Sequence, residues 1–379
     1  MNKNLNPAFA KLGLSPTLQK AITKLNFDTP TPIQTEAIPA ILEGGDLLAG
    51  AQTGSGKTLA YIAPLCQKIM THKADNVNHS KGRNVRAFIL VPTRELVVQV
   101  REMVQQLNEH IWPAIRCLSV YGGVKIESQN HAMAHGVDIL VATPQRALEL
   151  AKLKALSFNK LETLVIDEAD RLMDNHFRES LDQVVKYLPD SRQNLLFTAT
   201  LPDVIRPIVR HWLNQPTIIN LHSDSDGEPI KQSRISVSKS RKVEALTELL
   251  QTNDWKQVLI FCNAKKTCDR VKAKLGDQGI DAAVLHANKT QRERLTSLSE
   301  FQSGKQRVLI ATDIVARGLD ILGLPCVINY ELPRIANDFT HRCGRTGRAG
   351  KNGEVITLVA ESEEGHRRSI EKQLGVILS

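Results

Sequence analysis

The chain has 379 residues and a mass of 42.0 kDa, and its 49 Lys and Arg residues against 40 Asp and Glu give a net charge of +9. Because 42% of the residues are hydrophobic, the chain can bury ordinary cores, so a disordered protein is excluded and the length suits two or three domains. The positive charge suits the binding of phosphates. Because only 4% of the residues are aromatic, the chain offers few flat side chains on which bases could stack.

The cysteines and the apolar stretches indicate the compartment. Six cysteines occur without a CxxC pair, which favours free thiols over a zinc site or a disulfide framework. The N-terminal residues lack the apolar run of a signal peptide, and no apolar stretch reaches the ~18 residues of a membrane-spanning helix. We therefore expect a cytoplasmic protein.

Short apolar runs alternate with helical patterns along the whole chain. The runs predict strands at 46–49, 87–91, 138–142, 164–166, 195–198, 258–261, 282–285, 308–311, 327–330 and 355–359. Helical patterns lie between them, for example at 94–109, 265–278 and 291–302. Continuous apolar runs suit strands buried on both faces, so the alternation predicts α/β domains with doubly wound parallel sheets.

Two polar stretches interrupt this alternation. Residues 222–229 are polar, contain Gly and Pro and have no apolar period, which is typical of a linker. The chain is therefore predicted to form a first domain at 1–222, a linker at 223–229 and a second domain at 230–379. Residues 72–84 are predicted to form a surface loop within the first domain.

A glycine-rich segment at 51–58 follows the first predicted strand and precedes a helix expected from Leu59 onward. Together with Gly50 it has the spacing G-x-x-x-x-G-K-[ST] of a phosphate-binding loop. Glycines let backbone N–H groups turn toward a polyphosphate, while the lysine reaches the β- and γ-phosphates and the hydroxyl binds Mg²⁺. The predicted nucleotide contacts are Thr53, Gly54, Ser55, Gly56, Lys57 and Thr58.

Carboxylates follow another apolar strand, at 164–166. Asp167 and Glu168 come directly after it, at the end of the strand where ligands of parallel sheets bind. We expect Asp167 to hold Mg²⁺, through water, and Glu168 to orient and deprotonate the attacking water.

Residues 167–170 read Asp-Glu-Ala-Asp, and with the other motifs in order they resemble the DEAD-box ATP-dependent RNA helicases over residues 9 to about 353. The resemblance implies two tandem RecA-like domains and an ATP hydrolase that acts on RNA, with ATP and Mg²⁺ as cofactors. It implies local, sequence-independent unwinding of short duplexes or remodelling of RNA–protein complexes. Within the family the chain looks most like the bacterial RhlE-type branch.

The resemblance also assigns roles to individual residues. In an adenine-recognition segment at 7–34, Gln34 would read the adenine edge and Phe27 would stack on the ring. Asp320 would accept from the ribose, and Arg345 and Arg348 would stabilise the transferring phosphoryl group. The implied RNA contacts are Pro92, Thr93, Arg94, Gly122, Gly123, Thr143, Arg146, Arg294, Thr312 and Gly318. The implied coupling residues are Asp170, Thr198, Thr200 and His341.

Other functions stay open at this point. An ATP-dependent RNA clamp with little strand separation would need the same motifs. A DNA translocase shares the phosphate loop and paired arginines, but the spelling of the other motifs favours RNA. The physiological partner is open too, with ribosomal and RNA-degradation assemblies as possibilities. Gln145 and Ala287 replace the family's usual glycines.

Overall fold

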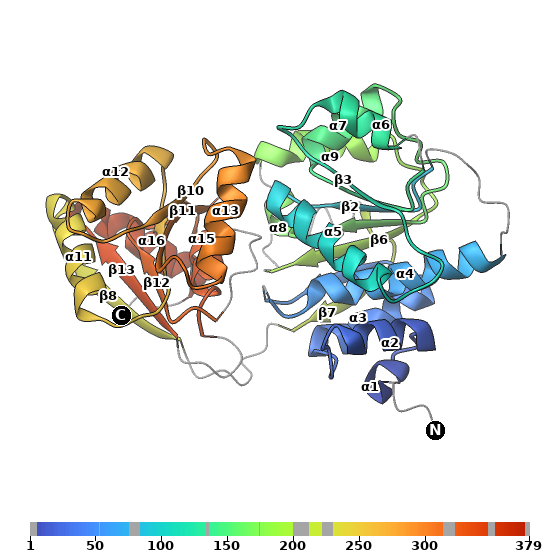
Figure 1. Ribbon diagram of the computed structural model, residues 1–379, viewed down its shortest axis with the longest axis horizontal. Coiled ribbons are helices and arrows are strands. Elements are labelled where there is room, and N and C mark those ends of the chain that lie inside the picture. Colours follow the sequence, from blue (N-terminus) through green and yellow to red (C-terminus); the bar gives the residue numbers. More distant parts are fainter. Residues whose placement is uncertain are drawn as a thin grey trace. The chain divides into compact units, whose positions relative to one another are not determined.

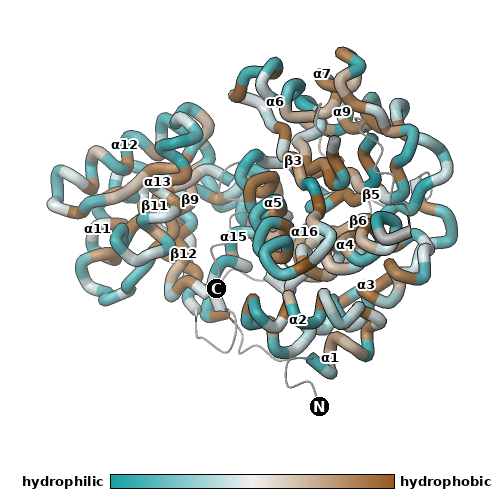
Figure 2. The backbone as a smooth tube through the Cα atoms, turned by 45° about the vertical axis from the view of Figure 1, so that its right-hand side comes forward, coloured by the Kyte–Doolittle hydropathy of each residue, from teal (hydrophilic) through white to brown (hydrophobic). Residues whose placement is uncertain are grey.

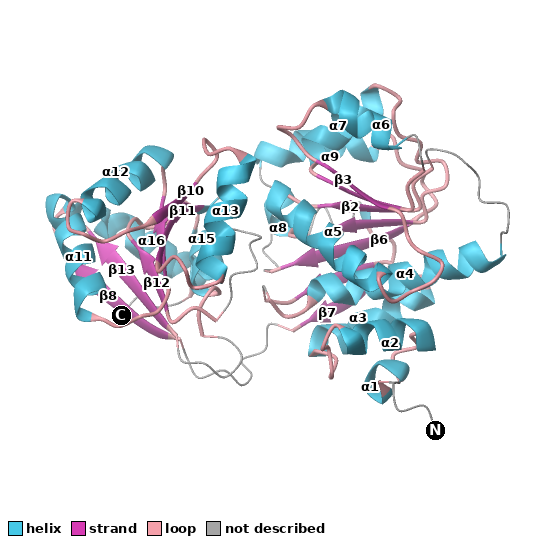
Figure 3. Ribbon diagram, in the orientation of Figure 1, coloured by secondary structure: helices cyan, strands magenta, loops and turns pink. Residues whose placement is uncertain are grey.

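The computed structural model describes residues 6–52, 54–75, 84–133, 136–173, 175–199, 212–221, 230–313, 323–347 and 353–375. The chain divides into two compact units, Met1–Ser223 and Asp224–Ser379. Each unit contains a parallel sheet with helices on both faces, which confirms the predicted fold class (Figure 1, Figure 3). The predicted linker lies outside the described residues, and the exact domain limits stay a prediction.

The first unit is built on a seven-stranded sheet in the order β3-β4-β2-β5-β6-β1-β7. Its strands are β1 (Leu47–Gly50), β2 (Ala87–Leu90), β3 (Cys117–Val120), β4 (Ile139–Ala142), β5 (Thr163–Ile166), β6 (Gln193–Thr198) and β7 (Thr217–Asn220). Its helices are α1 (Pro7–Ala10), α2 (Pro16–Lys24), α3 (Pro32–Glu43), α4 (Lys57–Asp75), α5 (Arg94–Asn108), α6 (Ile126–Met133), α7 (Pro144–Lys152), α8 (Ala169–Leu172) and α9 (Asn175–Val185).

Alternate strand residues of the first unit supply two separate hydrophobic cores. Leu47 and Ala49 of β1 pack in one core, and Leu48 packs in the other. Helices α1 to α5 contribute to the first core, and α6 to α9 contribute to the second. The apolar runs are therefore buried on both faces, as their composition predicted.

The second unit is built on a six-stranded sheet in the order β10-β11-β9-β12-β13-β8. Its strands are β8 (Lys231–Ser236), β9 (Val258–Cys262), β10 (Ala283–Leu285), β11 (Val308–Thr312), β12 (Cys326–Asn329) and β13 (Glu354–Val359). Its helices are α11 (Lys242–Thr252), α12 (Lys265–Gly276), α13 (Gln291–Gln302), α15 (Ala336–Cys343) and α16 (Glu364–Leu374), with short 3-10 turns at Lys239–Arg241 and Glu361–Glu363.

The second sheet also separates two cores. Leu259 and Phe261 of β9 pack with α13, α15 and α16, whereas Ile260 packs with α11 and α12. Hydrophobic and hydrophilic residues alternate along the helices of both units (Figure 2), and in α5 the hydrophobic residues Val97, Val100 and Val104 are buried in the first core. None of the helices in the described part of the chain is both long and apolar enough to cross a membrane.

The prediction of a loop at 72–84 was wrong for its first residues. Helix α4 begins at Lys57, two residues earlier than expected, and runs on to Asp75. Its last turn is held in place because Lys73 Nζ donates to the Ala114 carbonyl (2.8 Å) and to the Asp138 carboxylate (2.5 Å). Those partners are distant in sequence, so local polarity could not reveal them.

Candidate functional site

The strand order of the first unit sorts the predicted motifs into two neighbouring groups. Strands β5, β6 and β1 are adjacent, so their carboxyl ends bring together the carboxylates after β5, Thr198 at the end of β6 and the loop after β1. Strands β3, β4 and β2 are also adjacent, and the segments implied in RNA binding follow their carboxyl ends. One edge of the sheet therefore carries both groups.

The phosphate loop has the backbone geometry that its glycines permit. Gly54 and Gly56 adopt φ angles of 79° and 93°, which disfavour other residues. Lys57 is 8% exposed and opens α4, where its Nζ donates to the carbonyls of Ala51 (2.5 Å) and Gln52 (2.9 Å). The lysine is thus held inside the loop. Thr53 lies outside the described residues.

Gln34 contacts this loop directly. It is 2% exposed, and its Nε2 donates to the Gly56 carbonyl (3.1 Å) while its Oε1 accepts from the Thr31 N–H (3.0 Å). A Cβ on Gly56 would lie 2.5 Å from Gln34 Nε2, so a glycine is needed there. The structure therefore joins the adenine-recognition segment to the phosphate loop through this amide, whereas the reading of adenine stays a prediction.

The aromatic residues of the same segment differ in exposure. Phe27 is half-buried against the first core, and its carbonyl accepts from Asn6 Nδ2 (3.1 Å). Phe9 is completely buried in that core. Phe27 is therefore partly accessible, as stacking on a nucleotide base requires. Phe9 is instead part of the hydrophobic core.

Asp167 occupies a buried, fully hydrogen-bonded position after β5. Its Oδ2 accepts from the Tyr61 hydroxyl (3.0 Å) and its Oδ1 accepts from the Glu168 N–H (2.8 Å). Burial raises the pKa of Asp167 from 3.8 to about 6, and the Lys57 ammonium opposes this rise. A buried carboxylate that resists ionisation in this way would be stabilised by a bound cation.

Glu168 adopts a left-handed backbone conformation, with φ 51° and ψ 51°, at the N-cap of α8. Such a conformation costs on the order of 1–3 kcal/mol for a residue with a side chain, and strained residues of this kind gather at functional sites. Its carboxylate is 3.8 Å from Arg171 Nη1. Glu168 thus joins the end of β5 to the start of α8, next to Asp167.

Thr198 is completely buried, and its carbonyl accepts from the Ala51 N–H (3.1 Å) at the base of the phosphate loop. This bond joins the predicted coupling motif to the nucleotide segment. Thr200 lies outside the described residues, and Asp170 lies in α8, close in sequence to Asp167 and Glu168.

The donor set fits a nucleotide with Mg²⁺. Lys57 supplies a cation beside the loop, and Thr58 and Asp167 carry oxygen atoms of the kind that Mg²⁺ prefers as ligands. In the described ranges no group of three or more His, Cys, Asp or Glu residues could hold a metal. A phosphate-bound Mg²⁺ does not need one, because it keeps several waters and binds one or two protein ligands.

Arg94 and the glycine pair form a single cluster at the other half of the sheet edge. Gly123 has a φ of 86°, and a Cβ there would lie 2.3 Å from Arg94 Nη1; one on Gly122 would lie 3.2 Å from Nη2. The guanidinium therefore lies against the glycine turn after β3. The glycines leave the space that Arg94 occupies, and backbone N–H groups and a cation are placed together.

Arg146 has a different environment from Arg94. It is 8% exposed and donates from Nη1 to the Val124 carbonyl (2.9 Å) and to Gln129 Oε1 (2.9 Å), and from Nε to the Glu149 carboxylate (2.8 Å). These bonds hold the segment that follows the glycine turn. Its implied contact with RNA stays a prediction, and the structure adds a positioning role.

The three remaining implied contacts of this half are helix-start residues. Thr93 caps α5, where its hydroxyl accepts from the Leu96 N–H (3.3 Å), and Pro92 precedes it in a buried position. Thr143 is the N-cap residue of α7. N-termini of helices favour anions, which suits a contact with phosphates.

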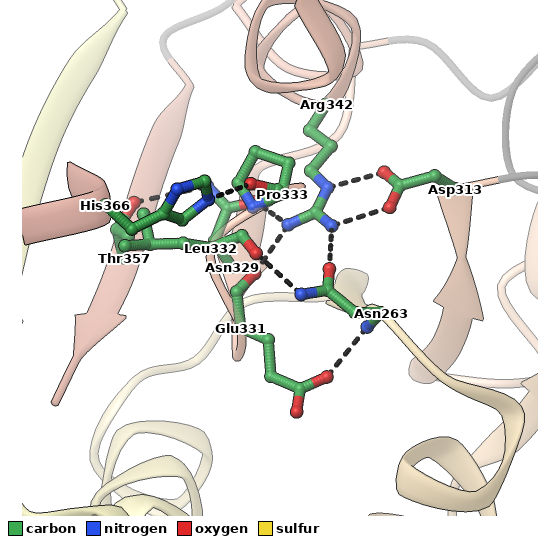
Figure 4. A network of polar contacts seen from close by, with 9 residues as sticks. All are labelled: Asn263, Asp313, Asn329, Glu331, Leu332, Pro333, Arg342, Thr357 and His366. Atoms are coloured by element: carbon green, nitrogen blue, oxygen red, sulfur yellow. Dashed lines mark hydrogen bonds and ion pairs between the residues drawn. The ribbon is translucent and has the colours of Figure 1, made fainter. Parts of the chain in front are cut away.

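In the second unit, one buried guanidinium joins several strand ends (Figure 4). Arg342 is 1% exposed and donates from Nε and Nη2 to the two Asp313 oxygens (2.6 and 2.7 Å). It also donates to Asn263 Oδ1 (2.9 Å), Asn329 Oδ1 (3.0 Å) and the Glu331 carbonyl (2.6 Å). All five N–H donors of the guanidinium are used, so the ends of β9, β11 and β12 are tied to α15.

The predicted residues of the second unit are mostly buried. Thr312, Arg294, His341 and Arg345 are 8%, 5%, 8% and 1% exposed. Arg294 Nη2 donates to Gln291 Oε1 at the start of α13. Gly318, Asp320 and Arg348 lie outside the described residues. The roles of these residues in binding RNA and ATP stay predictions.

Two residues in these networks were missed by sequence reasoning. Tyr61 lies four residues after Lys57, and the signal was an aromatic hydroxyl within an otherwise apolar helix. Arg342 is in the same basic run as Arg345, and nothing local distinguishes a buried arginine from one that binds a ligand.

Comparisons with known proteins agree with this geometry. The family described as DEAD/DEAH box helicase matches residues 31–208, and the helicase conserved C-terminal domain matches residues 241–350. ATP-dependent RNA helicase CshA of Listeria monocytogenes is 38% identical over 367 residues, covering 96% of this chain and 68% of the relative. A CshA of Bacillus cereus is 36% identical over 365 residues, with coverages of 96% and 67%. These names do not test the RhlE-type branch, which stays a prediction.

Solved structures give the same result. Saccharomyces cerevisiae Dbp5 bound to RNA and ADP BeF3 matches with a TM-score of 0.83 and 29% identity, covering 98% of this chain and 94% of that one. Mss116p bound to ssRNA and AMP-PNP matches with a TM-score of 0.88 and 26% identity, with coverages of 100% and 79%. The chain therefore belongs to the DEAD-box ATP-dependent RNA helicases, enzymes with two RecA-like domains.

Proposed function

We propose that this helicase uses RNA-stimulated hydrolysis of Mg²⁺-bound ATP to separate short RNA duplexes or remodel RNA–protein complexes locally. The observation that carries the proposal is the adjacency of β1, β6 and β5, whose ends place Lys57, Thr198 and Asp167 at one sheet edge. The next strands of the same sheet carry Arg94 and its glycine turn.

Each residue of the ATP site has a proposed task. Lys57 exchanges its bonds to the loop carbonyls for bonds to the β- and γ-phosphates, and Gln34 holds the loop and reads adenine. Thr58 would hold Mg²⁺ and Asp167 would hold it through water, and the ion would neutralise charge on the phosphates. Glu168 orients the attacking water and takes its proton.

The RNA site is proposed to contact the backbone rather than the bases. Arg94 and the N–H groups of the glycine turn suit phosphate oxygens, which fix register without reading sequence. The similar Dbp5 and Mss116p structures are bound to RNA together with ADP BeF3 or AMP-PNP, which supports RNA as the partner. Binding should weaken steeply with salt and vary little with sequence.

The second domain is proposed to supply Arg345 and Arg348 to the transferring phosphoryl group and Asp320 to the ribose. Both domains would then take part in binding ATP and RNA. Thermodynamic linkage requires that RNA raise the affinity for ATP by the same factor as ATP raises the affinity for RNA. Thr198, Thr200, Asp170 and His341 are proposed to transmit this coupling.

The experiment compares ATP turnover with and without single-stranded RNA at low salt, for the wild type and for Glu168→Gln. We expect RNA to accelerate the wild type, whereas Glu168→Gln should bind ATP normally and turn over slower by orders of magnitude. Unchanged turnover at saturating RNA would contradict the coupling. Equal stimulation by DNA would favour a DNA translocase, because the 2′-OH should distinguish RNA.

A strand-displacement assay on a short duplex separates unwinding from clamping. Displacement in step with ATP turnover supports the helicase, whereas long RNA residence without displacement supports an ATP-dependent clamp. We propose the cytoplasm as its location, where ATP and such RNAs are found, and cell fractionation tests this. Crosslinking to RNA in cells tests ribosomal and RNA-degradation assemblies as partners.

A further inference from the structure

Tyr61 connects the phosphate-loop helix to the acidic motif. The residue lies in α4, one helical turn after Lys57, and its side chain is completely buried. Its ring packs against Phe197 of β6, with the ring centroids 5.2 Å apart and the planes at 55°. Its hydroxyl donates to Asp167 Oδ2 at 3.0 Å. One side chain therefore touches α4, β6 and the end of β5.

Tyr61 and Thr58 lie three residues apart in α4, so they share one side of the helix. Burial, together with the neighbouring Asp167 carboxylate, raises the pKa of Tyr61 well above its usual value of 10.0.

The contacts leave Asp167 with one defined orientation. Its Oδ2 accepts from Tyr61 and its Oδ1 accepts from the Glu168 N–H, so rotation of the carboxylate would break both bonds. The ring alone would fill the space beside Phe197, and the hydroxyl is not needed for that packing. The hydroxyl instead donates to Asp167, which is proposed to bind Mg²⁺.

We propose that Tyr61 is a positioning residue for the metal, whose hydroxyl aligns the Asp167 carboxylate for Mg²⁺ bound to the nucleotide. This inference rests on the Mg²⁺ site of the proposed function. Groups that orient metal ligands typically change metal affinity 10- to 100-fold when they are removed. The loss of this hydroxyl should therefore lower the affinity of the site for Mg²⁺ and leave the affinity for the nucleotide without Mg²⁺ unchanged.

The test compares the wild type, Tyr61→Phe and the control Tyr187→Phe, whose tyrosine is 48% exposed. ADP affinity is measured by calorimetry in EDTA and at rising Mg²⁺ concentrations. For Tyr61→Phe we expect the ADP affinity in EDTA to be unchanged. The Mg²⁺ concentration at which the Mg²⁺-dependent increase in ADP affinity is half complete should rise roughly tenfold. Tyr187→Phe should match the wild type in both measurements.

Two results would overturn the inference. The Mg²⁺ dependence of Tyr61→Phe could equal that of the wild type. Alternatively, its ADP affinity could fall by the same factor with and without Mg²⁺, which would show that the hydroxyl acts through packing. Failure of the underlying site looks different, because wild-type ADP binding would then itself be independent of Mg²⁺.

Discussion

The buried guanidinium of Arg342 should be a main source of stability in the second domain. It is 1% exposed and makes five hydrogen bonds, two of them to an Asp313 side chain that is itself only 14% exposed. Its Cζ atom also lies 5.0 Å from the centroid of the Phe261 ring. Removing one partner of such a pair strands a buried charge, which costs about 3–5 kcal/mol.

The predicted change is a loss of about 3–5 kcal/mol in the unfolding free energy of the second domain for Arg342→Met. Arg342→Lys should recover only part of it, because an ammonium cannot span Asp313, Asn263 and Asn329 at once. The double variant Arg342→Met/Asp313→Leu should be more stable than Arg342→Met alone, because the unpaired carboxylate is gone.

The assay is urea unfolding of the full chain followed by the fluorescence of Trp255. The chain has three tryptophans, so Trp112→Phe and Trp212→Phe leave Trp255 as a reporter of the second domain alone. Arg241→Met is the matched control, since its pair with Glu244 is exposed and worth at most about 1 kcal/mol. An Arg342→Met variant within 1 kcal/mol of the control would refute the reasoning.

Two further predictions concern the first domain. Asp167→Asn should raise the free energy of unfolding in urea by roughly 3 kcal/mol above pH 6 and leave it unchanged below pH 3.8. The pKa of Asp167 rises from 3.8 to about 6 on folding, so the ionised carboxylate destabilises the folded state at high pH, whereas the protonated one does not. A variant as stable as the wild type at pH 8 would contradict this sign. Arg94→Gln should weaken RNA binding for all sequences and lower the salt slope by about one. Gly123→Ala should have the same effect, because its Cβ would lie 2.3 Å from Arg94 Nη1 and displace the guanidinium. The measurement is RNA binding at several salt concentrations, and unchanged salt slopes would contradict the predictions for both variants.

Sequence patterns predicted the buried parts of the fold better than its edges. The central strands are apolar throughout because both faces are covered, and their positions were anticipated to within about a residue or two. Strands β3, β7 and β8 were not among the predicted strands, and each lies at an edge of its sheet. Strand β8 is polar and half-exposed, and within the described part of the chain it pairs with β13 alone. Strand β8 forms because its backbone hydrogen-bonds to β13, which is distant in sequence. The composition of its side chains does not indicate this pairing.

The candidate site divides in a similar way. The phosphate loop was predictable because its glycines and lysine act within one short segment. The environments of Arg146 and Arg342 were not predictable, since their partners come from other strands and loops. A basic side chain in a motif can bind a ligand or hold the protein together, and only the folded partners distinguish the two.

The buried charged residues Lys242, Arg342 and Asp167 illustrate this difference between structural and ligand-binding side chains. Lys242 of α11 is 2% exposed and uses its three donors on the Tyr330 carbonyl, the Leu358 carbonyl and Glu363, just as Arg342 uses its five. Asp167 is also hydrogen-bonded, yet its pKa stays raised to about 6, so its charge is not compensated by the protein alone. Saturated cations of this kind join strand ends to helices, whereas a buried carboxylate with a raised pKa and a fixed orientation suits the Mg²⁺ that we propose it holds.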